Sequence, residues 1–333
     1  MSADLRARLA AVPSSHPELA PAVRARAADT VAALESPDAL ASLAVDPYWP
    51  KWDSPWWEMI ALAEVGLADL IPKRVVLALV EALNAMPMHT FPIRPEEWPE
   101  GIDRHRHTSC HCALGNIDQV LAACGVDVDR ELPWIREWYA RYQMADGGYN
   151  CDETAYLAEG ETPSSMVGTI AVFEALIARG PSEECDRAAA FMIERELRHG
   201  SQTQHNAAER ESAKAWGELT FPRFYFYDVL RGATALVRWA VQHGRTLPLA
   251  AISPVLEHLL AIGADGTLRV GRRAWDGKKT RTPVNNWEAR QPAKTTALIE
   301  GTSVVGDANA ILTQQWTELR ANVIALIDAG RAL

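Results

Sequence analysis

Hydrophobic positions recur at helical spacing along most of the chain, and the alternation typical of β-strands is nearly absent. The pattern divides into consecutive pairs of amphipathic segments, with glycine or proline where a helix is expected to end or begin. An additional helix is expected near 21–34, so the sequence predicts an all-α protein. The predicted pairs are 54–69 with 72–86, 107–125 with 132–143, 163–180 with 182–200, 221–244 with 247–262, and 288–300 with 313–330.

Within each pair the first segment is the more apolar and the richer in small residues. In the pair 163–180 and 182–200, the first contains MVGTIAVFEALIA and the second CDRAAAFMIEREL. A helix that is apolar on nearly all sides must be covered on nearly all sides, whereas a helix with a charged face can keep that face in water. Five or six such hairpins would bury their apolar faces by closing into an α/α toroid with an inner and an outer ring. An open superhelix is the alternative with the same local pattern.

Two segments interrupt the helical pattern within what we expect to be a single domain, 1–333. Segment 86–106 contains four prolines, and segment 266–292 is rich in Arg, Lys, Gly and Pro. Both are predicted to be long irregular loops. Loops of this length inside a compact domain often act as lids.

Composition narrows the class of partner. The chain has 333 residues, 48% of them hydrophobic, and a formal net charge of −10. Such an acidic balance would repel phosphates, so no nucleic-acid partner is expected. No apolar run is long enough for a transmembrane segment, and the N-terminus lacks the pattern of a secretory signal. The five cysteines are an odd number and do not indicate a framework of disulfides, so we expect a cytoplasmic protein with reduced thiols.

Two motifs carry a resemblance to a known superfamily. Segment 138–149, WYARYQMADGGY, resembles the Gln-Trp repeat of squalene and hopene cyclases, in which a helix, Gln, Asp-Gly-Gly and an aromatic residue recur. The following stretch 162–169 is similar to the helix after such a turn. Segment 107–115, HTSCHCALG, resembles the His-Thr-Cys-aromatic-Cys segment of protein prenyltransferase β subunits, with one residue inserted. Over about residues 50–330 the chain therefore resembles the prenyltransferase and squalene-cyclase superfamily of α/α toroids.

This resemblance implies an enzyme with an apolar, isoprenoid-like small molecule in the central cavity. The implied chemistry is acid/base- or metal-assisted cyclisation, isomerisation, or hydration and dehydration. A zinc-dependent, prenyltransferase-like transferase is an alternative within the superfamily. The acid motif Asp-x-Asp-Asp of class II cyclases is matched by 150–155, NCDETA, without its first Asp, and the Asp-x-Cys of prenyltransferases by 228–230, DVL, without its Cys.

Thiol and imidazole groups cluster around one predicted helix start, and zinc prefers these ligands. Side chains two positions apart on a helix point in different directions, so Cys110 and Cys112 can share a metal only in an irregular turn. A Cys–His thiolate pair is a further option, and small buried thiols in a packed inner ring are the structural alternative. The candidate zinc ligands are His107, Cys110, His111, Cys112 and Cys151.

Carboxylates beside apolar sequence are candidates for acid/base catalysis, because a buried, protonated carboxyl can donate a proton. The predicted catalytic residues are Asp152, Glu153, Asp228 and Arg231. Asp228 lies in an aromatic segment, and Arg231 three positions on is close enough to pair with it. The alternatives are helix-start residues for Asp152 and Glu153 and a buried structural ion pair for Asp228.

Aromatic residues are unusually frequent, with 12 Trp in the chain. They could wall an apolar pocket, or they could be core residues whose polar atoms need partners. The predicted substrate-binding residues are Trp56, Trp57, Tyr149, Arg223, Tyr225 and Tyr227, with the arginine anchoring an anionic group. Two other functions fit the same fold class: a non-catalytic binding module, and a carbohydrate-active α/α barrel with two facing carboxylates.

Overall fold

A computed structural model describes residues 2–52, 54–85, 95–97, 100, 110–273, 279–280, 291–293 and 295–333. Within these residues the chain is almost entirely helical, as predicted, with a two-stranded antiparallel sheet of β1 (Lys279–Thr280) and β2 (Gln291–Pro292). Most of the loop 86–106 and part of 266–292 lie outside the described residues. The helices are α1 (Ser2–Ala11), α2 (Pro21–Leu34), α3 (Pro37–Val45), α4 (Pro55–Glu64), η1 (Ala68–Leu70), α5 (Lys73–Ala85), η3 (Pro95–Glu97), α6 (His111–Ala123), α7 (Val128–Glu131), α8 (Trp134–Tyr142), η4 (Glu153–Leu157), α9 (Met166–Arg179), α10 (Glu183–Glu194), α11 (Ala208–Ala213), α12 (Val229–Gln242), α13 (Leu249–Ile262), α14 (Ala297–Thr302) and α15 (Ala310–Asp328).

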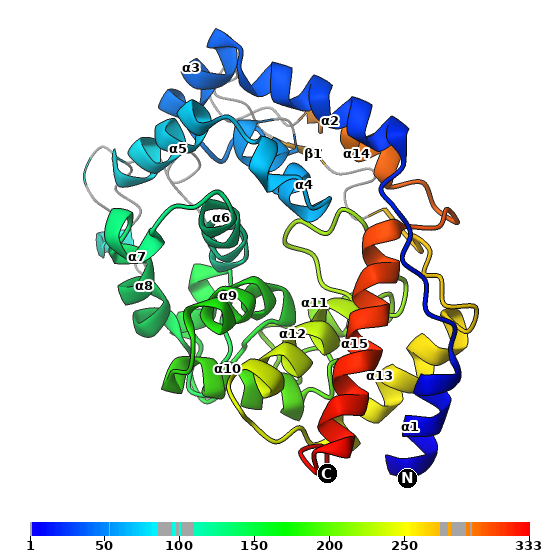
Figure 1. Cartoon of the computed structure of the whole chain (residues 1–333). Coiled ribbons are helices and arrows are strands. Elements are labelled where there is room, and N and C mark those ends of the chain that lie inside the picture. Colours follow the sequence, from blue (N-terminus) through cyan, green and yellow to red (C-terminus); the bar gives the residue numbers. More distant parts are fainter. Residues whose placement is uncertain are drawn as a thin grey trace.

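The helices form an α/α toroid. Helices α4, α6, α9, α12 and α15 surround the centre, and they pack on one another in this order from α4 to α15 (Figure 1). Helices α5, α8, α10, α13 and α1 lie outside them. Four predicted pairs correspond to α4/α5, α6/α8, α9/α10 and α12/α13, with the first helix of each in the inner position. The inner helix is the more apolar one in the first three pairs, whereas in the fourth the outer helix α13 is the more apolar.

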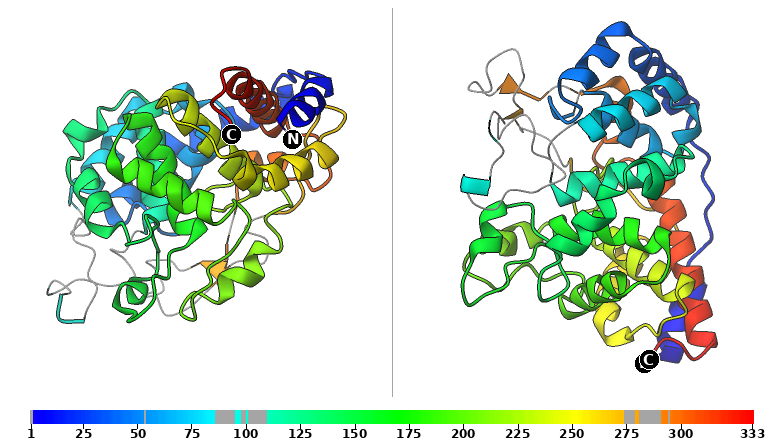
Figure 2. Two further views of the ribbon diagram at one scale, coloured as in Figure 1. Left: turned by 90° about the horizontal axis from the view of Figure 1, so that it is seen from below. Right: turned by 90° about the vertical axis from the view of Figure 1, so that its left-hand side faces the viewer.

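The inner helices run parallel, so their like ends meet. His243, just after α12, hydrogen-bonds the carbonyl of Ile177 near the end of α9. Leu247 pairs with the segment after α15. The turns that precede the inner helices therefore gather on one face, which we call the amino-terminal face. Helix α11 lies there and holds α9, since Glu209 accepts a hydrogen bond from the backbone N–H of Met166. Figure 2 shows α11 and η4 projecting from the ring.

The last predicted pair is corrected by the structure. Helix α15 packs against α1, a helix that the sequence did not predict, and α14 packs against α2 (Figures 1 and 2). The N-terminal segment thus supplies the outer partner of the last inner helix. Arg320 of α15 secures this contact by donating to the carbonyls of Leu9 and Val12 at 3.0 and 2.7 Å.

Helix α12 starts later than predicted. The sequence pattern predicted a helix from 221, but the helix begins at Val229, with Asp228 as its N-cap. Segment 221–228 is not helical and passes through the interior of the ring; we call it the crossing segment. Its residue Phe224 has a positive φ of 51°, which no regular helix accommodates.

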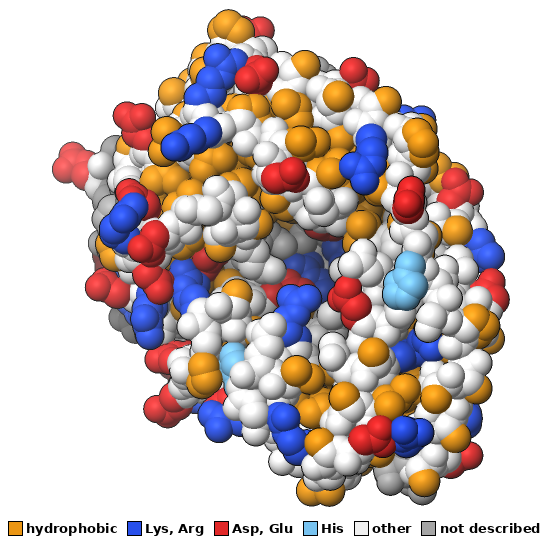
Figure 3. All heavy atoms as spheres, in the orientation of Figure 1, with side chains coloured by type: hydrophobic (Ala, Val, Ile, Leu, Met, Phe, Trp, Pro, Cys, Tyr) orange, Lys and Arg blue, Asp and Glu red, His pale blue; other side chains and the backbone are white. Residues whose placement is uncertain are grey.

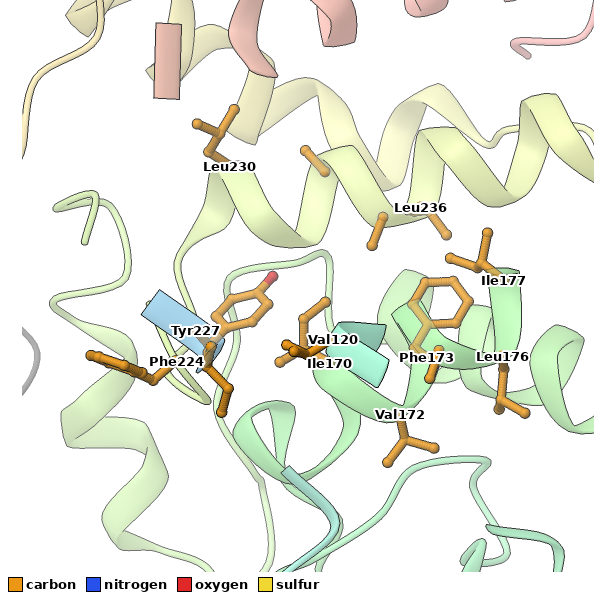
Figure 4. Packing of buried hydrophobic residues seen from close by; sticks show 14 of the residues in the cluster. Val120, Ile170, Val172, Phe173, Leu176, Ile177, Phe224, Tyr227, Leu230 and Leu236 are labelled. Carbon is orange, nitrogen blue, oxygen red and sulfur yellow. The ribbon is translucent and has the colours of Figure 1, made fainter. Parts of the chain in front are cut away.

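Small residues allow the inner helices to approach closely. A Cβ atom added at Gly115 of α6 would lie 2.4 Å from the backbone carbon of Ala171 in α9. Farther round the ring, Phe173 and Ile177 of α9 point towards Leu236 of α12 (Figure 4). All three of these side chains are fully or almost fully buried. Among the described residues no helix is long and apolar enough to cross a membrane.

The α6–α9 contact predicts the effect of one added methyl group. Gly115→Ala should lower the free energy of unfolding by about 1–3 kcal/mol, because the overpacking outweighs the gain in helix propensity. Denaturant unfolding would measure the change. The matched control, Ala122→Ser on an exposed position of the same helix, should stay within about 0.5 kcal/mol. A Gly115→Ala protein as stable as the wild type would contradict the close approach.

Candidate active site

Three cysteine sulphurs meet where α6 begins. Cys110 is the N-cap, with extended backbone, and Cys112 lies in the first turn of the helix. Cys151 comes from the segment before η4. The three Sγ atoms lie within 4.8 Å of one another. The irregular backbone that the sequence required is therefore present, because Cys110 stands outside the helical geometry.

The cluster favours a negative charge on one sulphur. Hydrogen bonds from Cys112 and Cys151 lower the pKa of Cys110 well below its usual value, and nearby Lys51 adds to this effect. The pKa of Cys112 is raised, first by burial, and that of Cys151 is raised, first by its hydrogen bond with Cys110. The Sγ atoms of Cys110 and Cys112 lie 2.9 Å apart. The arrangement therefore favours ionisation of Cys110 over that of Cys112 and Cys151.

Aromatic rings and one cation surround the sulphurs. The Lys51 Nζ atom lies 5.0 Å from the ring centre of Tyr225 and 5.1 Å from that of Tyr48. Trp52 stacks on Tyr225 at 5.7 Å. Burial raises the pKa of both tyrosines, and each also senses the charge of the cysteines, which places them next to the cluster. Tyr225, one of the predicted substrate-binding residues, thus lies beside the cysteines.

His111 does not join the cysteines, contrary to the prediction. Its Nδ1 atom hydrogen-bonds the carbonyl of Asn150 at 2.7 Å, and its Nε2 atom accepts from the Trp138 indole N–H at 2.8 Å. Both ring nitrogens are thus used within the core. Burial lowers the pKa of His111 to about 4. His107, the other predicted imidazole ligand, lies outside the described residues.

Most of the predicted aromatic wall belongs to the core instead. Trp56 and Trp57 are completely buried in α4, and the Trp57 indole N–H donates to the carbonyl of Tyr48 at 2.7 Å. Tyr149 and Tyr227 are also completely buried. Their hydroxyls donate to backbone carbonyls at 3.2 and 2.7 Å. Of the predicted aromatic residues, only Tyr225 lies beside the cysteines, and the other four are packed in the core.

Asp152 does not suit the predicted role of proton donor. Its side chain is 54% exposed, and the His205 ring nitrogen lies 3.0 Å from Oδ2. Burial opposes ionisation, but hydrogen bonds from Thr154 and His205 outweigh it and lower the pKa of Asp152. Glu153, the next residue, is half-buried at the start of η4. The alternative of a helix-start residue therefore describes Asp152 better.

Asp228 is a fully buried carboxylate that is already satisfied. It accepts hydrogen bonds from the Arg223 Nε atom at 2.7 Å, from the backbone N–H of Arg231 at 2.9 Å, and from the Thr220 hydroxyl at 3.2 Å. Burial opposes its ionisation, but the charge of Arg223 and these hydrogen bonds lower the pKa. Asp228 is therefore ionised, and as a carboxylate it has no proton to donate.

Arg231 pairs with Glu174 and not, as predicted, with the side chain of Asp228. Its Nη2 atom lies 2.6 Å from Glu174 Oε2 in α9. Its Nη1 atom donates to the carbonyls of Phe224 and Phe226 at 2.8 and 2.9 Å. Arg231 thereby holds the crossing segment against the inner helices.

Glu64, at the end of α4, was not predicted as a functional residue. Its two carboxyl oxygens accept the backbone N–H groups of Arg223 and Phe224, each at 2.5 Å. Burial raises its pKa to about 7, even though Arg231 and Arg223 oppose the rise. In the sequence Glu64 resembled an ordinary charge in the last turn of an amphipathic helix. The only feature that set Glu64 apart in the sequence was that the helix it ends is unusually apolar.

Glu64 lines a central cavity of about 290 Å³. Figure 3 shows the hollow at the centre of the ring, with acidic and basic side chains inside it. Arg223, a predicted substrate-binding residue, and Arg231, a predicted catalytic residue, also line it. The lining residues are Ile60, Ala63, Glu64, Asn116, Gln119, Val120, Ala123, Glu174, Phe221, Arg223, Arg231, Thr234, Ala235, Arg238 and Gln315. The cavity is thus more polar than an apolar substrate requires.

Comparisons with known proteins add little to this description. No family model and no curated protein matches the sequence. Among solved structures, the chain is similar to the apo form of a type II terpene cyclase, MstE, from Scytonema, with 14% sequence identity and a TM-score of 0.26. The match covers 92% of this chain and 99% of that chain. The toroid assignment therefore rests on the helix arrangement itself.

The buried pair of Asp228 and Arg223 predicts a stability effect. Asp228→Asn should lower the free energy of unfolding by about 3–5 kcal/mol, because it leaves a buried guanidinium without its charge partner. Since the pKa of Asp228 is lowered on folding from 3.8, its contribution is present above that value and is lost as the pH falls. Urea unfolding at neutral and acidic pH would measure both effects.

Asp152→Asn is the control for this substitution. It replaces a largely exposed carboxylate, so the free energy of unfolding should change by less than about 1 kcal/mol. Equal effects of the two substitutions would contradict a special role for the Asp228 pair.

Proposed function

We propose that the protein is a zinc-dependent enzyme acting on an apolar, isoprenoid-like small molecule at the amino-terminal face of the toroid. Cys110, Cys112 and Cys151 would hold the metal. The observation that carries the proposal is the meeting of three sulphurs, from two segments distant in the sequence, within 4.8 Å of one another. The reaction classes are those that the sequence resemblance implies, namely cyclisation, isomerisation or addition of water.

The donor set fits zinc. Thiolates are ligands that zinc prefers, and catalytic sites use three protein ligands and keep the fourth position open. The lowered pKa of Cys110 makes one donor thiolate available before a metal binds. Bound zinc would supply Lewis-acid chemistry, which polarises a substrate group or lowers the pKa of a bound water.

The rings beside the cysteines support an apolar substrate. Tyr48, Trp52 and Tyr225 present aromatic surface next to the cluster, and Lys51 already lies over two of these rings. The face of an aromatic ring attracts a cation, so the same rings would stabilise positive charge that develops on a carbon skeleton. These side chains would thus orient the substrate and exclude water from it.

Acid-initiated chemistry by the predicted carboxylates has less support. Asp152 and Asp228 both have lowered pKa values, so at neutral pH neither holds a proton. Glu64 has a pKa of about 7, but it lies in the central cavity and not beside the cysteines. Metal assistance is therefore the variant of the proposal that the geometry favours.

Metal content tests the proposal directly. Protein purified without chelators and with reduced thiols should bind about one zinc ion per chain by elemental mass spectrometry, as a single three-cysteine site requires. Cys112→Ser and Cys151→Ser should lose most of this zinc because each removes one of three ligands. The wild-type protein should also convert linear isoprenoid alcohols or diphosphates to products seen by mass spectrometry, and both variants should lose this conversion.

The matched control is Cys124→Ser, at the other end of α6 and away from the cluster. It should keep the zinc and the conversion. A wild-type chain that takes up no zinc on titration would contradict the metal site. Zinc uptake without conversion of any isoprenoid would contradict the substrate class alone.

A further inference from the structure

The central cavity is separate from the cysteine cluster. None of the three cysteines lines the cavity, but both sites touch α6, where Asn116 of the lining donates a hydrogen bond to the Cys112 carbonyl at 2.7 Å. The crossing segment lies between them, with Arg223 on the cavity side and Tyr225 on the cysteine side. The cavity therefore needs an explanation that the proposed metal site does not give.

One positively charged side chain of the cavity lining has no charge partner among the described residues. Arg231 is paired with Glu174 at 2.6 Å, and Arg223 with the buried Asp228 at 2.7 Å. Arg238 of α12 also lines the cavity, at its solvent-exposed side, and no hydrogen bond or ion pair joins it to any described residue. When Glu64 holds its proton, the surroundings carry one net positive charge.

Two buried polar atoms of the lining also lack partners in the described part of the chain. They are the Nη2 atom of Arg223, whose residue is only 5% exposed, and the hydroxyl oxygen of Thr234. A buried donor without a partner destabilises the folded protein, and a charged donor does so more strongly. An anion in the cavity would accept hydrogen bonds from both atoms and would be attracted by Arg238.

The size and lining indicate the class of anion. A volume of about 290 Å³ lies at the lower end of the range for small-molecule pockets. Ile60, Val120 and Ala235 supply apolar surface for a short hydrocarbon part. A phosphate dianion would exceed the single net positive charge and would be repelled by Glu174, whereas a carboxylate matches that charge.

We infer that the central cavity is a binding site for a small organic carboxylate, whose charged end is held by Arg223, Thr234 and Arg238. The apolar side chains of α4, α6 and α12 hold the remainder of the ligand. This site is independent of the zinc proposal and can be tested on protein without metal.

Binding of hexanoate, measured by isothermal titration calorimetry, tests the site. Hexanoate should bind, and neutral hexanamide and inorganic phosphate should bind at least about tenfold more weakly, since each loses a charge-assisted hydrogen bond or meets repulsion. Arg238→Gln should weaken hexanoate binding by about tenfold or more for the same reason. Arg24→Gln, on the exposed face of α2, is the matched control and should leave binding unchanged.

Thr234→Val separates ligand binding from folding. The hydroxyl has no partner in the described structure, so its removal should leave the melting temperature of the free protein unchanged or higher. Hexanoate binding should nevertheless weaken. Absence of hexanoate binding, equal binding of hexanamide, tighter binding of phosphate, or unchanged affinity in both Arg238→Gln and Thr234→Val would each overturn the inference.

The affinity should also depend on pH through Glu64. The charged groups that surround it are Arg223 of the crossing segment, Arg231 and Arg238 of α12, and Glu174 of α9. Helices α6 and α15 contribute no charged side chain to the lining. Its pKa is about 7, so a rise in pH through this value places a second negative charge beside the ligand.

Hexanoate affinity should therefore fall by about fivefold between pH 6 and pH 8, if bound hexanoate raises the pKa of Glu64 by about one unit. In Glu64→Gln the affinity should be nearly constant over this range. Repeating the titrations on Cys112→Ser keeps the two proposals apart, because loss of the zinc site should not affect hexanoate binding. A wild-type affinity that does not change between pH 6 and pH 8 would contradict the role of Glu64.

Discussion

The interior of the ring depends on the guanidinium group of Arg231. It joins the carboxylate of Glu174 in α9 to the carbonyls of Phe224 and Phe226 in the crossing segment. A non-helical segment inside a protein leaves backbone polar groups that must find partners. Arg231 satisfies two of them, and Glu64 satisfies two more from the opposite side. Without these charged groups the centre of the toroid could not hold an irregular segment.

This segment divides the ring into two different environments. The segment turns at Phe224, which has a positive φ, and the backbone N–H of Phe226 donates to the carbonyl of Arg223. On the two sides of this turn, Arg223 faces the cavity and Tyr225 lies beside the cysteines. Aromatic and thiol groups therefore collect at the amino-terminal face. Charged groups collect where the inner helices continue. The two proposed sites follow from one segment and from the parallel direction of the inner helices.

The fold could be predicted from the sequence because the difference between inner and outer helices is local. An inner helix such as α9 is apolar on nearly all sides, and that is visible residue by residue. The cysteine cluster was predicted in part, since thiols are recognisable by type. The role of His111 was not, because its partners Trp138 and Asn150 lie 27 and 39 positions away. The partner of Arg231 was not predicted for the same reason, because the carboxylate of Glu174 lies 57 positions away.

Glu64 and Asp228 show why residue type alone could not indicate which buried carboxyl titrates near neutral pH. Both carboxyls contact the crossing segment, and burial opposes the ionisation of each. The pKa of Glu64 is nevertheless raised, whereas that of Asp228 is lowered. Asp228 is paired directly with the Arg223 guanidinium, which outweighs the cost of burial. Glu64 receives two backbone N–H groups but no guanidinium hydrogen bond, so its pKa stays near 7. The carboxyl whose pKa lies near 7 therefore lines the cavity, while the three cysteines lie on the other side of the crossing segment. The proposed metal site and a titratable carboxyl are thereby kept apart within one ring.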